Sequence, residues 1–399
     1  MPTSSRPAAF ATAALTAGLA LWTSGAPSVV YPVYGREWSL PPALTTVVFG
    51  TYPVTLLVVL GLFGGISDRI GRRAAIVLGL ALMAVGTLAF ALAPSIGVLL
   101  VGRALTGAGV GFALSPATAA LAEYARPGRG HLAGAVATAS TAAGLTVALL
   151  LGGLFLDLLP DPLHLSYWPL LGAVLVVLVL ALRLPSGARS SGSAVRLLRV
   201  DPSMRGVVAQ GALGVAAAYG TGGVVLALGA DVAVGLLGTD SPIVIGLVLA
   251  LSAVTIGVTA LLARRVRAGA AAPAGALVMV AGLAALVTAS AAGSLPVFLV
   301  SIVLTGVGYS LLFSAGVGIA AELAPAQHRA STVSAVYFAG YAVQAVAAIG
   351  LGQLATAHGL LPAIVAGAVV LSVLALVAGA APFVRARRAV RTATGGNPA

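Results

Sequence analysis

One charged side chain, Arg103, stands inside an otherwise uncharged stretch of about residues 96–122. About 20 apolar residues span a bilayer, so this stretch predicts a membrane helix that carries the arginine well inside it. A charge at that depth is costly in lipid unless it faces protein or water, and this makes Arg103 a candidate functional residue. The alternative is a structural arginine that bonds to backbone carbonyls of a neighbouring helix.

The residues that usually build enzyme and metal sites are scarce. The chain has no cysteine, which excludes disulfides, thiol catalysis and cysteine-based metal sites. All four histidines, at 131, 164, 328 and 358, fall at the edges of apolar runs and have no partners at ligand spacing. We therefore expect no enzyme activity, no metal and no cofactor.

Composition indicates a membrane protein. The 399 residues are 60% apolar and 8% charged, whereas a soluble domain carries about 25% charged residues. The apolar runs predict twelve membrane helices at about residues 8–33, 41–63, 74–93, 96–122, 132–156, 165–182, 206–229, 242–263, 271–291, 295–321, 330–354 and 360–384.

Arginines set the predicted orientation. Nineteen of the 21 arginines fall before the first helix, in alternate loops, in the segment 183–205 or in the tail 385–399. Cytoplasmic loops carry such an excess, so we expect both termini to be cytoplasmic. Because the charge is spread over membrane-edge loops, nucleic-acid binding is not expected.

The two halves of the sequence repeat. A shift of 199 residues places Thr106, Gly107 and Gly109 on Thr305, Gly306 and Gly308, and Glu123 on Glu322. Parallel repeats of this kind are found in transporters. The domains expected are a six-helix bundle at 1–182, a cytoplasmic linker at 183–205, a second six-helix bundle at 206–384 and a cytoplasmic tail at 385–399.

A charged, glycine-rich turn joins the second and third predicted helices. It resembles the loop signature of the major facilitator superfamily, and the matching residues are Gly64, Asp68, Arg69, Gly71, Arg72 and Arg73. The resemblance implies that this motif gates the cytoplasmic side. Asp68 would cap the start of helix 330–354, since a helix N-terminus favours an anion. Glu123 would pair with Arg72 or Arg73, and Glu322 with Arg264 or Arg265, as a cytoplasmic latch in each half.

Arg103, Gly107 and Gly109 resemble a motif in the fourth helix of antiporters in this superfamily. The resemblance implies a role for the arginine in proton coupling or substrate binding. Gly107 has a second interpretation together with Gly111, because glycines four residues apart allow close helix contact.

Carboxylates are expected only at the ends of the predicted spans. Glu123 and Glu322 lie at cytoplasmic ends, and Asp157 and Asp231 at outside edges. A transporter of organic cations usually needs a buried acid, so this pattern favours a neutral, amphiphilic or anionic substrate. Coupling to protons would be absent or would run through an edge carboxylate.

Candidate cavity residues are polar and aromatic side chains on the helices that line the pathway in the resembled fold. Tyr337, Tyr341 and Gln344 share one face of a helix, and Gln344 would be costly against lipid. The others are Trp22, Ser24, Tyr219, Tyr309 and Phe313. For each, helix packing or interface anchoring is the alternative.

These patterns together predict an all-α membrane protein with twelve transmembrane helices in two six-helix pseudo-repeat bundles. The function expected is secondary active transport by alternating access, as proton-coupled efflux of a small organic molecule. An uptake permease or facilitator of the same fold, and a non-transporting membrane sensor, are the alternatives. We expect a monomer in the cell's cytoplasmic membrane, with a small-molecule substrate, protons and the lipid bilayer as partners.

Overall fold

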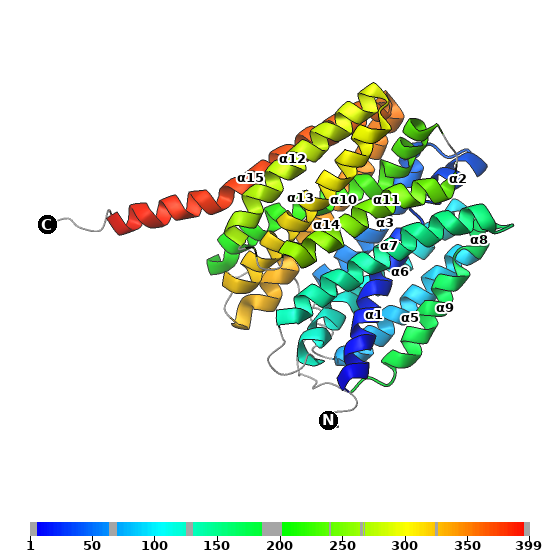
Figure 1. Ribbon diagram of the computed structural model, residues 1–399. Coiled ribbons are helices and arrows are strands. Elements are labelled where there is room, and N and C mark those ends of the chain that lie inside the picture. The colour runs from blue at the N-terminus through cyan, green and yellow to red at the C-terminus, as the bar shows by residue number, and fades with distance from the viewer. Residues whose placement is uncertain are drawn as a thin grey trace.

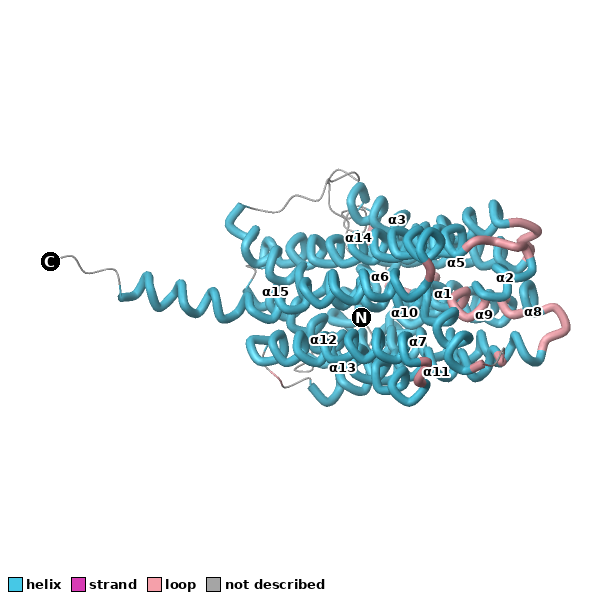
Figure 2. The backbone as a smooth tube through the Cα atoms, turned by 90° about the horizontal axis from the view of Figure 1, so that it is seen from above, coloured by secondary structure: helices cyan, strands magenta, loops and turns pink. Residues whose placement is uncertain are grey.

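The computed structural model describes residues 6–63, 70–124, 131–185, 202–238, 241–263, 266, 268–323 and 326–394. These residues form helices and contain no strand. Twelve helices are long and apolar enough to cross a membrane, as the sequence predicts. They lie side by side in one bundle, and α15 extends beyond it (Figures 1 and 2).

The first six spans and their short connecting helices form what we call the N-half. Its helices are α1 (Arg6–Gly25), α2 (Tyr31–Glu37), α3 (Pro42–Phe63), α5 (Arg72–Ala91), α6 (Ile96–Tyr124), α7 (His131–Leu158), α8 (Pro162–Leu165) and α9 (Trp168–Ala181).

The last six spans form the C-half. Its elements are η2 (Pro202–Met204), α10 (Arg205–Leu237), α11 (Pro242–Leu262), α12 (Ala268–Ala292), α13 (Leu295–Leu323), α14 (Ala326–His358) and α15 (Leu360–Thr394). The predicted tail therefore begins as helix, because α15 continues past residue 384.

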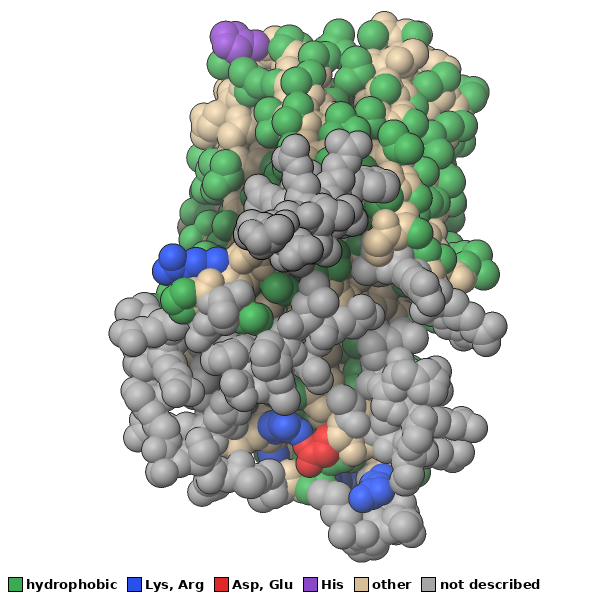
Figure 3. Space-filling model, turned by 90° about the vertical axis from the view of Figure 1, so that its left-hand side faces the viewer, with side chains coloured by type: hydrophobic (Ala, Val, Ile, Leu, Met, Phe, Trp, Pro, Cys, Tyr) green, Lys and Arg blue, Asp and Glu red, His purple; other side chains and the backbone are tan. Residues whose placement is uncertain are grey.

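The outer surface is suited to lipid. Large apolar side chains point outward, including Leu262, Val346 and Val176, whose exposed fractions are 79%, 72% and 61%. In Figure 3 the upper part of the face is largely hydrophobic, and described basic side chains lie next to the segments drawn in grey. An apolar surface of this extent is favourable against the hydrocarbon of a bilayer and unfavourable in water.

The first predicted span, 8–33, is two helices. The first helix, α1, ends at Gly25, and α2 begins at Tyr31 after a turn. Pro27 lies in this turn and has no N–H to continue a helix, while Pro32 occupies the first turn of α2, where a missing N–H costs nothing. The apolar composition hides this break.

Asp231 corrects a second expectation. The helix α10 runs on to Leu237 and ends at Gly238, whose φ of 58° is left-handed. Asp231 is therefore a half-buried residue of a membrane helix and not of a loop. The expectation that no carboxylate lies within a span was wrong, because hydropathy placed the end of this helix too early.

The two halves repeat contacts as well as sequence. In the N-half the Thr23 hydroxyl lies 3.8 Å from the Met83 sulfur, and in the C-half Thr221 lies 3.4 Å from the Met279 sulfur. Gly109 packs against Met83, and its sequence counterpart Gly308 packs against Met279.

The halves contact each other along α3 and α14 and along α7 and α11, and several of the close contacts lie at one end of the bundle. We call this the α2 end, because α2 and α8 lie there, and the opposite end, where α1 begins, the terminal end (Figure 1). At the α2 end the backbone N–H of Ala43 in α3 donates to the Thr356 hydroxyl of α14 at 2.9 Å. There α7 and α11 also cross closely, since a Cβ added to Gly246 would lie 2.5 Å from the Leu149 carbonyl oxygen.

Part of the predicted gating machinery falls outside the described residues. Gly64, Asp68 and Arg69 do so, as do Arg264, Arg265 and most of the linker. The side chain of Glu322 is also outside the description. Their proposed roles stay predictions.

Candidate functional site

A cavity of about 680 Å³ lies between the halves. Its walls include Leu56 and Leu60 of α3, Thr118 of α6 and Thr138 of α7 from the N-half, and Val317 of α13 from the C-half. Thr118 and Val317 lie within about two helical turns of the helix ends at the terminal end. The cavity therefore extends from the middle of the bundle toward the terminal end, while the halves are in contact at the α2 end.

The C-half wall is aromatic. Five side chains predicted as cavity candidates line this wall, and they are Tyr219, Tyr309, Phe313, Tyr337 and Tyr341. The ring centroids of Tyr219 and Phe313 are 5.6 Å apart with planes at 12°, and those of Tyr309 and Phe313 are 5.9 Å apart with planes at 20°. These near-parallel rings stack on one another and give the wall aromatic faces and edges that apolar aromatic groups can pack against.

The N-half wall carries hydroxyl groups that the sequence analysis did not single out. These are Ser115 and Thr118 of α6 and Thr138 and Thr141 of α7. Each pair is spaced i, i+3 and so shares one face of its helix. This spacing is the signal that could have found them, although serine and threonine are common in membrane helices for packing reasons.

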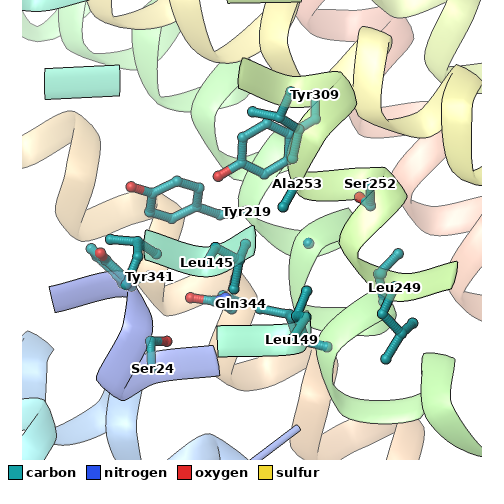
Figure 4. A pocket seen from close by; sticks show the side chains of 15 residues that line it. Ser24, Leu145, Leu149, Tyr219, Leu249, Ser252, Ala253, Tyr309, Tyr341 and Gln344 are labelled. Carbon is teal, nitrogen blue, oxygen red and sulfur yellow. The ribbon is translucent and has the colours of Figure 1, made fainter. Parts of the chain in front are cut away.

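A small chamber of about 70 Å³ adjoins the large cavity, and Tyr219, Tyr309 and Tyr341 line both. Ser24 of α1 lines the chamber from the N-half and Gln344 of α14 from the C-half. Figure 4 shows their side chains around one space, with Tyr341 beside them. Both are 92% or more buried, with exposed fractions of 4% and 8%.

Trp22, the remaining cavity candidate, lines neither space. It is half-buried and packs against the apolar core of the bundle. For this residue the structure is in keeping with the packing alternative.

Arg103 is fully buried and also lines neither space. Its Nη1 donates to the backbone carbonyls of Ser24 at 3.0 Å and Thr23 at 3.4 Å, and its Nε donates to the Tyr31 hydroxyl at 2.9 Å. The guanidinium Cζ also lies 5.5–5.9 Å from the ring centroids of four aromatic residues, Tyr31, Phe49, Tyr52 and Phe90.

These contacts explain how the charge is tolerated. The last carbonyls of a helix have no partner within it and carry partial negative charge. Since α1 ends at Gly25, Arg103 satisfies two of these carbonyls and links them to Tyr31 at the start of α2. Burial raises the pKa of the Tyr31 hydroxyl, with Arg103 opposing the rise, so Tyr31 faces the guanidinium as a neutral phenol. Arg103 therefore holds the α1–α2 break together.

The predicted motif glycines bring helices together. A Cβ on Gly107 would overlap the Thr55 side chain of α3, and one on Gly109 would lie 2.6 Å from the Gly79 carbonyl oxygen of α5. Both contacts are within the N-half. They fit the interpretation that these glycines allow close helix packing.

In the described part of the turn motif, the backbone conformation and the ion pairing suit the residue types found there. Gly71 precedes α5 with a φ of 88°, a conformation that favours glycine. Arg72 of α5 forms an ion pair with Glu123 at the end of α6, as the latch hypothesis supposed for this pair. Both side chains belong to the N-half and are substantially exposed, at 41% and 50%. The pair therefore does not itself bridge the halves.

Comparison with known proteins gives a consistent assignment. A family model described as Major Facilitator Superfamily matches residues 13–348. No curated protein sequence matches the chain. Two solved structures of a bacterial homolog to the human lysosomal transporter Spinster, in inward-facing conformations, are similar in fold. The unoccupied one gives a TM-score of 0.70 at 14% identity, covering 96% of this chain and 98% of that one. The occupied one gives 0.71 at 16% identity, covering 95% and 96%.

Proposed function

Since this chain belongs to the Major Facilitator Superfamily, we propose that the cavity between its halves is the substrate site of a proton-coupled exporter. The chain is a multi-pass membrane protein with the fold of a secondary transporter that works by alternating access, and it is not an enzyme. The identity of the substrate, the direction of transport and the coupling ion are what we propose in addition.

The position of the cavity carries the proposal. Both halves line it, it extends toward the terminal end, and the halves close over it at the α2 end. Rocking the halves about this site would separate the contacts at the α2 end and bring the terminal ends together. A substrate bound in the middle would then change its side of access without leaving the site.

Direction follows from the predicted orientation. If the arginine-rich loops are cytoplasmic, the terminal end faces the cytoplasm and the cavity is loaded from inside. The chain would then export its substrate across the cell's cytoplasmic membrane, acting as a monomer. An uptake permease or a facilitator of the same fold has the same architecture and remains the second candidate.

Two carboxylates at the α2 end support proton coupling. Asp157 at the end of α7 bonds to the first turn of α11, and Asp231 of α10 lies within electrostatic reach of Arg36. Asp157 bonds across the halves, and Asp231 and Arg36 lie in opposite halves, so protonating either carboxylate would weaken the attraction between the halves at the α2 end. Protonation from that side would thereby shift the balance between the two access states, and net antiport further requires that the proton be released at the terminal end.

Proton movement in inside-out vesicles tests the proposal. The vesicles would be energised to an acid interior, and neutral, anionic and cationic small molecules would be added in turn. A substrate-dependent loss of the gradient that disappears in Asp157→Ala or Asp231→Asn would support proton antiport. Labelled compounds that cross without any proton movement would instead favour the facilitator.

A further inference from the structure

Gln344 has a polar atom without a partner. Its side chain is 8% exposed, and its Oε1 accepts no hydrogen bond in the described structure. A buried polar atom left unsatisfied costs about 1–3 kcal/mol. Because Gln344 lines the small chamber, the group that would satisfy it can be a ligand that enters from the large cavity.

The chamber limits what can reach Gln344. Its volume of about 70 Å³ holds a small polar group or a few waters, but not a ring system. The adjoining cavity of about 680 Å³ is within the range of sites for drug-sized molecules, and the stacked rings of Tyr219, Tyr309 and Phe313 make one of its walls aromatic. The two spaces together fit a molecule with a small polar end and a planar apolar body.

The lining also limits the charge of the ligand. None of the described residues that line either space is charged. Arg103 is the fully buried cation of this region, and its guanidinium is occupied by carbonyls, Tyr31 and aromatic rings. An ionised ligand would lose its water without gaining a counter-charge, which is strongly unfavourable.

The hydroxyl groups of the opposite wall favour a ligand that donates hydrogen bonds. The Thr118 hydroxyl donates to the Leu114 carbonyl and the Thr141 hydroxyl to the Thr138 carbonyl, each at 2.9 Å. A hydroxyl has one proton and two lone pairs, so both side chains present acceptors to the cavity. The Gln344 Oε1 is an acceptor as well.

We propose that the substrate is an uncharged, planar amphiphile that carries an N–H or O–H donor. Its polar end enters the small chamber and donates to Gln344, and its apolar body lies along the Tyr219, Tyr309 and Phe313 rings. This inference rests on the proposed function, because it takes the cavity to be the transport site.

Three closely related probes separate the features of this ligand. 2-Naphthylamine is planar, is uncharged at neutral pH and carries its N–H donors on a small group at one end. N,N-dimethyl-2-naphthylamine lacks the donor, and 2-naphthalenesulfonate has an anionic group in place of the amine. Equilibrium binding of each radiolabelled probe would be measured on the purified full chain in lipid nanodiscs, with empty nanodiscs as background. We expect 2-naphthylamine to bind most tightly of the three.

Gln344→Met keeps the size of the side chain and removes its hydrogen bonding. We expect this change to weaken binding of 2-naphthylamine by about five- to tenfold and to leave binding of the dimethyl probe unchanged. Gln210→Met is the matched control. Gln210 is also 8% exposed with an unpartnered Oε1, but it lines neither space. Thermal unfolding of both variants would show that they remain folded.

Different results would contradict the proposed substrate class and the proposed transport function. Tighter binding of the sulfonate than of the amine, or an equal loss of both uncharged probes in Gln344→Met, would overturn the proposed class. Transport would be measured separately, as exchange of the same labelled probes across proteoliposome membranes. A sulfonate that binds and crosses would reject the class and keep the transporter, whereas Gln344-dependent binding without any crossing would reject the transport site.

Discussion

The Asp157 carboxylate at the end of α7 accepts a hydrogen bond from the backbone N–H of Ile243, 3.2 Å away in the first turn of α11. It also accepts one from the Ser241 hydroxyl at 3.3 Å. A side chain of the N-half thus satisfies the free N-terminus of a helix in the C-half, where an anion is favoured. This contact exists only while the α2 end is closed.

Asp157→Ala should therefore favour opening at the α2 end. We expect about a threefold faster reaction of Ser252→Cys, at the small chamber, with an impermeant maleimide added from that side. Asn caps helices nearly as well as Asp, so Asp157→Asn should change the rate less than Asp157→Ala. Equal rates in all three proteins would show that the cap does not hold the end closed.

Gly246 should be intolerant of any side chain. An added Cβ would lie 2.5 Å from the Leu149 carbonyl oxygen and 3.2 Å from Gly153 Cα, so the close crossing of α7 and α11 could not form. Gly246→Ala should open the α2 end and reduce probe exchange in proteoliposomes by about tenfold or more. Gly172→Ala is the control, since nothing lies within 4 Å of its added Cβ. Normal exchange by Gly246→Ala would mean that this crossing is not part of the closed state.

Removing Arg103 should destabilise the fold. Arg103→Met leaves the Ser24 carbonyl and the Tyr31 hydroxyl without their buried partner, and we expect a loss of about 3 kcal/mol in the free energy of unfolding. Tyr31→Phe removes the hydroxyl and keeps the ring, so its cost should be smaller, at about 1–3 kcal/mol. Chemical unfolding in detergent would measure both. A stable Arg103→Met protein that binds probe but no longer moves protons would instead assign Arg103 to coupling.

The ion pair between Arg72 and Glu123 should contribute little to stability. Both side chains are substantially exposed, and exposed pairs contribute at most about 1 kcal/mol. Glu123→Gln should therefore unfold within about 1 kcal/mol of the parent. A larger loss in the same unfolding measurement would show that Glu123 has a partner beyond Arg72.

The sequence predicts most of this fold because its signals are local. Apolar runs locate the twelve helices, and the repeat at Thr106 and Thr305 predicts two related halves. Tyr337, Tyr341 and Gln344 share a helix face that can be read from spacing alone, and the structure places all three at the two spaces.

What the sequence hides depends on distant contacts or on small differences in hydropathy. The residues around Pro27 are uncharged, and apolar runs lie on both sides of the turn, so a hydropathy pattern averages over the break before α2. Arg103 is recognisable as a buried charge, but its partners Thr23, Ser24 and Tyr31 lie more than 70 residues away. The role of Asp157 likewise depends on how α7 and α11 approach each other.

Alternating access can be tested without knowing the substrate, because the natural chain has no cysteine. Ala43→Cys and Thr356→Cys would be joined by a disulfide across the α2 end, where the Ala43 nitrogen and the Thr356 hydroxyl oxygen lie 2.9 Å apart. Thr141→Cys in the cavity would report access to an impermeant maleimide in vesicles of each orientation. Without the disulfide we expect labelling from both sides, and with it from the terminal end alone, with reduction restoring the α2 side. Labelling from the α2 side that the disulfide leaves unchanged, or that never occurs, would contradict alternating access through this cavity.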